Sequence, residues 1–126
     1  MDTALIMENA LTTETLGQKQ RRFTGMVAQL IAFAYASGYE LTMGDAYRDP
    51  RVHGKVGERL SYSSANSLHK SRLAIDFNLF KDGIFMTQTE DHKALGEFWE
   101  SIGGTWGGRF SNPDGNHYSV EHNGRK

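Results

Sequence analysis

Apolar and polar residues alternate most clearly between residues 73 and 80, and this period of two predicts a β-strand. One face of that strand would carry only apolar side chains: Leu73, Ile75, Phe77 and Leu79. The opposite face would carry Asp76 in mid-strand, where aspartate is disfavoured. A carboxylate buried there is costly unless a cation meets it. Two interpretations stay open: Asp76 shares a cation with the nearby His69, or it lies on a solvated face.

The N-terminal half of the chain contains one clear helical pattern, from residue 18 to residue 37, with Gly38 as its stop. Its apolar positions recur at helical spacing: Phe23, Val27, Leu30, Ile31 and Ala34. Residues 1–17 are polar and rich in threonine, and we expect a loose or short-helical arm there. Residues 39–47 predict a strand. Residues 51–66 show no apolar period and predict a long loop of the kind that is often functional.

A second helix is predicted from Thr87 to residue 102, where Thr87 and Glu90 have the spacing of a capping box. A turn at residues 81–83 and a short strand at residues 84–86 would connect this helix to the central strand. The pattern of the middle of the chain is therefore strand, hairpin turn, strand and helix.

The C-terminal segment predicts a turn at residues 111–116 and a strand at residues 117–122. Alternation places His117 and His122 on opposite faces of a regular strand. The two histidines should therefore not bind the same ion.

These elements together predict a small single domain of the α+β class, in which helices flank an antiparallel sheet. The length of 126 residues suits one domain with one core. We expect that core to span about residues 18–122 and residues 1–17 to form the arm.

Composition narrows the function. The net charge of −1 argues against a nucleic-acid partner, because such proteins neutralise phosphates with an excess of cations. The chain has no cysteine, so any metal must be bound by His, Asp or Glu. No apolar run approaches the ~20 residues that a membrane span needs, and we expect no membrane insertion. The first residues lack the pattern of a signal peptide.

A catalytic zinc site needs three protein ligands, an open fourth position and a nearby carboxylate that accepts a proton. His69, Asp76 and one late histidine are candidate ligands. Asp114 lies on a turn three residues before His117, which favours His117 over His122. Two alternatives stay open: Asp114 serves only to form the turn, and Arg48, at the end of a predicted strand, only pairs with a neighbouring aspartate.

Several of these residues fall in motifs: Ser67-x-His69-x-x-x-x-Ala74-x-Asp76, Trp106-Gly107-Gly108, Asp114-x-x-His117-Tyr118 and an early Tyr47-Arg48. In order and spacing, the motifs resemble those of the zinc-dependent D-Ala-D-Ala carboxypeptidase (VanY-like) and L-alanyl-D-glutamate peptidase family, which includes compact phage endolysins. The resemblance covers roughly residues 20 to 120 and implies a Hedgehog/D-Ala-D-Ala peptidase-like fold.

The resemblance also implies a role for each residue. The zinc ligands would be His69, Asp76 and His117. Asp114 would be the general base, Arg48 would hold a substrate carboxylate or carbonyl, and Ser67 would support the site and the substrate by hydrogen bonding. One departure is Arg72, at a position where the family often has glycine. We expect Arg72 to affect the substrate cleft more than the metal.

By the same resemblance, the chain would be a monomeric zinc peptidase whose partner is the stem peptide of peptidoglycan, with L-alanyl-D-glutamate as the bond cut. As a phage endolysin it would stay in the host cytoplasm until a separate pore protein released it to the cell wall. D-Ala-D-Ala carboxypeptidase activity is the first alternative. A metal-dependent nuclease and a non-catalytic cell-wall-binding module are alternatives from other classes.

Overall fold

The computed structural model describes residues 14–126, so most of the expected arm at residues 1–17 lies outside the described residues. A five-stranded antiparallel sheet forms the centre of the fold, in the order β1-β2-β5-β4, with β3 also paired to β2. The strands are β1 (Tyr39–Met43), β2 (Ala74–Lys81), β3 (Ile84–Met86), β4 (Thr105–Trp106) and β5 (His117–Ser119). The prediction of a small α+β domain is thus confirmed.

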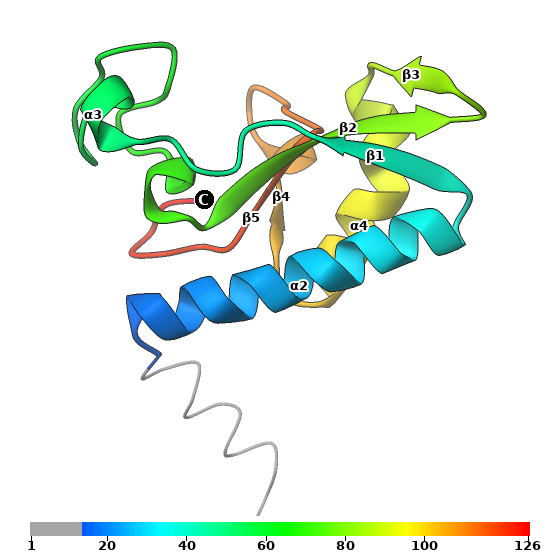
Figure 1. Cartoon of the computed structure of the whole chain (residues 1–126), viewed down its shortest axis with the longest axis horizontal. Helices are drawn as coiled ribbons and strands as arrows, with labels where there is room; N and C mark the ends of the chain where they lie inside the picture. The colour runs from blue at the N-terminus through cyan, green and yellow to red at the C-terminus, as the bar shows by residue number, and fades with distance from the viewer. Residues whose placement is uncertain (1–13) are drawn as a thin grey trace, which may run out of the picture.

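The helices have unequal lengths and places. The α-helices are α2 (Leu16–Ala36), α3 (Pro50–His53) and α4 (Lys93–Ser101), and three short 3-10 helices are η1 (Leu68–Ser71), η2 (Thr89–His92) and η3 (Gly107–Arg109). The long helix α2 runs beneath the sheet, and α3 lies at the far end of the molecule from the β2–β3 hairpin (Figure 1). None of the helices in the described part of the chain is both long and apolar enough to span a bilayer.

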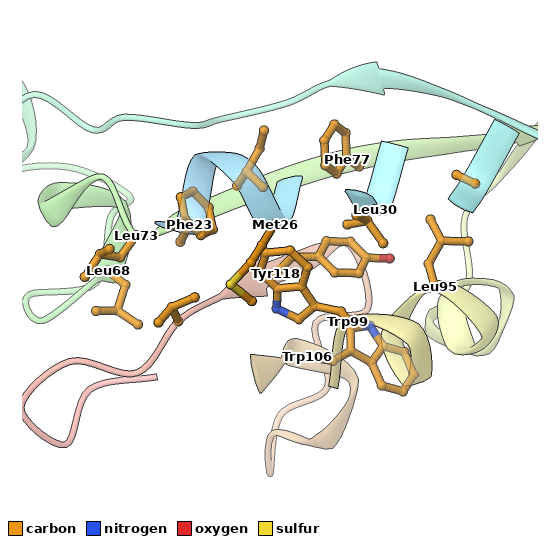
Figure 2. Packing of buried hydrophobic residues seen from close by; sticks show 14 of the residues in the cluster. Phe23, Met26, Leu30, Leu68, Leu73, Phe77, Leu95, Trp99, Trp106 and Tyr118 are labelled. Atoms are coloured by element: carbon orange, nitrogen blue, oxygen red, sulfur yellow. The ribbon is translucent and has the colours of Figure 1, made fainter. Parts of the chain in front are cut away.

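The core lies between the sheet and the helices α2 and α4. The predicted apolar face of the central strand is buried there, since Leu73, Ile75, Phe77 and Leu79 are all at most 5% exposed. In Figure 2, Phe23, Met26 and Leu30 of α2 pack toward Tyr118 of β5 and Trp99 of α4. This burial fixes the register of β2, because a slip by one residue would exchange its two faces.

Strand β2 pairs with three strands, β1, β3 and β5. Its later residues pair with β1, and its first three residues pair with β5, so that Asp76 lies directly opposite His117. The chain that leaves β1 continues beside Asp76, where the Gly44 N–H donates to the Asp76 carbonyl and the Asp76 N–H donates to the Asp45 carbonyl. The polar face of β2 therefore opens where β1 has ended.

Several element boundaries differ from the sequence prediction. The first strand ends at Met43 rather than at residue 47, because its regular pairing with β2 stops there. Gly44 and Asp45 stay hydrogen-bonded to Asp76 before the chain reaches α3. Helix α3 occupies the start of the predicted loop, with Asp49 as its N-cap and Pro50 in its first turn. The last strand ends at Ser119, and His122 instead forms an isolated bridge with Arg125.

The predicted capping box is wrong by one residue. The N-cap of the turn that precedes α4 is Gln88, and its N–H donates to the Asp91 carboxylate at 2.9 Å. The hydroxyl of Thr89 is used elsewhere, because it accepts from the Gly115 N–H. The hydroxyl of Thr87, the predicted cap, accepts from the Gln88 side-chain amide at 3.3 Å.

Candidate metal centre

His69 is the most buried member of the site, with 1% of its surface exposed. It lies in η1, and the Ser67 hydroxyl caps this turn by accepting the His69 N–H at 3.2 Å. The His69 Nδ1 faces the Ala46 carbonyl at 3.2 Å. A proton on Nδ1 would satisfy that carbonyl and leave Nε2 as a free lone pair, as metal-bound imidazoles require.

Asp76 and His117 complete the group from facing strands. The Asp76 Oδ1 lies 3.3 Å from the His69 Nε2 and 3.7 Å from the His117 Nδ1. The rings of His69 and His117 have centroids 5.3 Å apart. Burial alone would raise the pKa of Asp76, but the imidazoles of His117 and His69 outweigh it and hold that pKa well below its usual range.

This group fits a metal ion. One ligand atom of each of His69, Asp76 and His117 lies within 4.8 Å of the others. Three of their buried atoms have no hydrogen-bond partner among the described residues: His69 Nε2, Asp76 Oδ1 and His117 Nε2. Unpartnered buried polar atoms are costly, and two imidazoles with one carboxylate form a donor set that zinc accepts. A bound cation would satisfy atoms that the protein leaves free.

Arg48 lies beside this group and is held in place by three oxygens. Its Nε donates to Asp45 Oδ2 at 3.1 Å, and its Nη1 lies 3.4 Å from the hydroxyls of Ser63 and Ser67. Its Nη2 lies 3.6 Å from Asp76 Oδ2. The pairing of Arg48 with a neighbouring aspartate thus occurs, and it also orients the guanidinium next to the metal group.

Asp114 reaches the same region on a turn that Trp106 and Gly107 hold by hydrogen bonds. The Asp114 N–H donates to the Gly107 carbonyl at 2.9 Å, and the Trp106 indole donates to the Gly115 carbonyl at 2.8 Å. A side chain on Gly107 would overlap the Asp114 carbonyl, so this close approach needs glycine. The Trp-Gly-Gly motif therefore builds the support of the Asp114 turn.

The chemistry of Asp114 suits a proton acceptor. Its side chain is accessible, but surrounding protein atoms partly exclude water and the charge of Asp76 lies near. Both effects raise the pKa of Asp114 above its usual value. A carboxylate with a raised pKa takes up a proton more readily than an ordinary one.

A cavity of about 600 Å³ joins these residues. Its lining combines the candidate ligands with the flanking charged and polar groups: Arg48, Ser67, His69, Asp114, His117 and Lys126. Asp76 does not line the cavity itself, but it lies within 3.3–3.7 Å of three residues that do: His69, His117 and Arg48. His122 is not part of the group, because its Nδ1 faces the Lys19 ammonium at 3.1 Å.

Sequence reasoning missed Lys70, which supports the cavity wall. Its side chain is buried, and its Nζ donates to the carbonyls of Lys55, Glu58 and Ala65. One ammonium thereby ties the long loop to η1, directly after His69. No sequence motif marks this role, since the acceptors are backbone groups that every residue carries.

Arg72 adopts the left-handed conformation that explains the expectation of glycine. It ends η1 with φ 57° and ψ 36°. Its guanidinium stacks over the Tyr47 ring at 4.3 Å, and it does not line the 600 Å³ cavity. The expected effect of Arg72 on the cleft is therefore not seen in the geometry of the cavity.

The comparisons with known proteins bear on the same segment. Residues 61–120 match the family model of the D-alanyl-D-alanine carboxypeptidases. The carboxypeptidase match contains Ser67, His69, Asp76, Asp114 and His117, and it leaves out Arg48 and α2. It supports a hydrolase that acts on peptides, of the peptidoglycan peptidase kind. A search of curated proteins finds no match to the chain.

Proposed function

We propose that this protein is a zinc-dependent peptidoglycan peptidase that hydrolyses the L-alanyl-D-glutamate bond of the stem peptide. The observation that carries the proposal is the meeting of His69, Asp76 and His117, with buried unpartnered atoms, at a cavity that Asp114 and Arg48 also line. His69, Asp76 and His117 would hold the zinc. Ser67 would orient both Arg48 and η1 through its hydroxyl.

Bound zinc would supply Lewis-acid polarisation of the scissile carbonyl and would acidify the attacking water. Asp114 would accept the proton of that water as its oxygen bonds to the carbonyl carbon. Asp114 would then give the proton to the leaving amine as the C–N bond breaks. The Arg48 guanidinium would hold the developing negative charge or a substrate carboxylate, a role in which fixed donors are worth about 3–4 kcal/mol.

The setting of this activity is part of the proposal. A monomeric enzyme of this kind would act as an endolysin of a phage, held in the host cytoplasm until a separate pore protein lets it reach the cell wall. A D-Ala-D-Ala carboxypeptidase is the second candidate, and the description of the matching family model favours it. Both enzymes could use every residue named at this site.

Digestion of purified peptidoglycan tests the proposal. The zinc-loaded protein should release fragments with new amino groups on D-glutamate, and a chelator should abolish their release until zinc is restored. The matched control is Asp114→Asn, which should keep its zinc and lose about 10²–10⁴-fold in rate. Release of terminal D-alanine alone would establish the carboxypeptidase instead. No cleavage by the folded, zinc-loaded protein would refute the peptidase.

A further inference from the structure

A second cavity, of about 390 Å³, lies on the other side of the Asp114 turn. Pro113 and Asp114 line both cavities, so the turn is a shared rim between them. Its volume falls within the ~300–1,000 Å³ of ordinary ligand pockets. If Asp114 acts on the scissile bond, as the proposed function has it, the substrate has one cavity available on each side of that bond.

The two cavities differ in charge. The metal-side cavity has the cations Arg48 and Lys126, which suit a carboxylate. The described residues that line the second cavity include no lysine or arginine, and Asp114 on the shared rim is the one carboxylate among them. The other lining residues offer amides, hydroxyls and an aromatic ring: Asn78, Phe85, Gln88, Thr89 and Asn116. His92 also lines it, but burial lowers the pKa of His92 and favours the neutral ring. This lining suits an uncharged group that forms hydrogen bonds.

An aromatic pair borders the second cavity. Phe85 lines it and is 52% exposed, and its ring stacks on Phe80 with centroids 5.2 Å apart. Phe80 lies on the same face of β2 as Asp76, four residues further on, which is roughly 13 Å along a strand. An exposed aromatic face at the edge of a polar cavity is a surface on which the apolar face of a sugar ring can stack.

The length of the substrate then distinguishes the two candidate bonds. A cut between L-alanine and D-glutamate leaves alanine and a lactyl group between the bond and the sugar, a span of roughly 7 Å. A cut between the two D-alanines leaves about five such units, or roughly 17 Å, and those units carry the charges of D-glutamate and of the diamino acid. The short, uncharged segment of alanine and lactyl group matches the size and lining of the second cavity.

We propose that the second cavity binds the N-acetylmuramyl-L-alanyl group on the amino side of the scissile bond, with Phe85 as a sugar-stacking side chain. The carboxylate-bearing peptide on the other side then lies in the metal-side cavity, near Arg48. This assignment rests on the proposed function and gives the substrate one direction across the site.

A binding experiment tests the assignment without catalysis. N-acetylmuramyl-L-alaninamide has neither a free carboxylate nor the scissile bond, and it is titrated into the full chain by calorimetry and NMR. It should bind more tightly than N-acetyl-L-alaninamide and perturb Phe85 and Gln88. Phe85→Ala should weaken binding by several-fold to about tenfold, the range of one aromatic contact. The control Ile84→Ala, at an adjacent residue that is 64% exposed and does not line the cavity, should leave the affinity unchanged.

Two cleavage substrates separate this assignment from the proposed function. The zinc-loaded enzyme should cleave N-acetylmuramyl-L-alanyl-D-glutamate with a higher kcat/KM than N-acetyl-L-alanyl-D-glutamate, and Phe85→Ala should remove that preference. Equal cleavage of both, with no binding of the muramyl amide, would overturn the sugar site and leave the peptidase intact. Binding of the muramyl amide with cleavage of neither substrate would refute the proposed bond and keep the cavity assignment. Affinity for the amide that Phe85→Ala leaves unchanged would overturn the stacking role.

Discussion

At Arg72, an unfavourable backbone conformation is combined with a favourable side-chain contact. Its left-handed φ of 57° is disfavoured for residues with a Cβ by about 1–2 kcal/mol. Its guanidinium recovers part of this cost by stacking on Tyr47, a contact worth about 0.5–1 kcal/mol at an exposed site. Substitutions at residue 72 can measure the cost of the left-handed backbone separately from the gain of the stacking.

We expect Arg72→Gly to be more stable than Arg72→Ala by about 1 kcal/mol, because both lose the stacking and only alanine keeps the strained conformation. Urea unfolding of both variants measures the difference. The matched control is Glu97, an exposed residue inside α4, where the order should reverse and alanine should be better than glycine by about 1 kcal/mol. The same order at both positions would contradict the left-handed assignment.

His92 should make the stability of the protein depend on pH. Burial lowers its pKa below the ordinary 6.5, although the charge of Asp91 opposes this, and its Nδ1 pairs with the Tyr118 hydroxyl at 2.9 Å. Below about pH 6.5, His92 therefore binds a proton more readily in the unfolded chain than in the native protein. Stability should fall as the pH drops from about 6.5 towards the native pKa of His92.

His92→Gln tests this, because the amide can keep the bond to Tyr118 and does not titrate. Unfolding free energies at pH 7 and pH 5 should fall less in the variant than in the natural protein. An equal loss in both proteins would assign the acid sensitivity to other groups.

The residues of the candidate site were partly predictable from sequence. His69, Asp76, Asp114 and His117 stand in a spacing that is visible in the chain, and the structure brings them together, while their roles as ligands and base stay predictions. Lys70 was not predictable, because its partners are backbone carbonyls far along the chain. Side-chain type marks chemistry in a sequence, but it does not mark contacts to the main chain.

At the scale of elements, Gly107 joins η3 to the Asp114 turn at a distance that leaves no space for a side chain. Gly107→Ala would place a Cβ against the Asp114 carbonyl and 2.8 Å from the Cβ of His117. Since the first of these is backbone, the turn itself must move. We expect a loss of about 1–3 kcal/mol in stability, together with reduced turnover as Asp114 is displaced.

The control for this variant is Gly25→Ala, which lies in α2 where an added Cβ meets no atom within 4 Å. It should stabilise the protein by about 0.5–1 kcal/mol, the usual gain from alanine in a helix, and leave turnover unchanged. Denaturant midpoints and initial rates measure both variants. A Gly107→Ala protein with natural stability and rate would remove the proposed support of the turn.

Element types followed from the apolar pattern, while element ends did not. The buried face of β2 and the helices α2 and α4 were visible as periods in the sequence. The first strand was predicted too long, and the cap before α4 was placed one residue early. Neither error is visible in the local pattern: regular pairing of the first strand with β2 stops at Met43, and the Asp91 carboxylate accepts the Gln88 N–H and so moves the cap.

For the whole molecule, metal binding and folding should be linked. Zinc would bind the native group of His69, Asp76 and His117 far better than the unfolded chain, so zinc at 1,000 times its Kd should add about 4 kcal/mol to stability. Thermal unfolding should show a Tm that rises with added zinc and falls with a chelator. His69→Ala should bind little zinc and lose this response, and a full response in that variant would contradict the ligand assignment.

Lys70 allows the sequence of the neighbouring loop to vary, because it binds the backbone of that loop. The loop that forms one wall of the 600 Å³ cavity is tied down through its backbone, by carbonyls that remain whatever side chains stand at residues 55, 58 and 65. Apart from Ser63, whose hydroxyl holds Arg48, its side chains can therefore be exchanged while the backbone contacts to Lys70 stay in place. Selection or laboratory libraries can act on this loop as on a replaceable recognition surface, provided that Lys70 and Ser63 are kept.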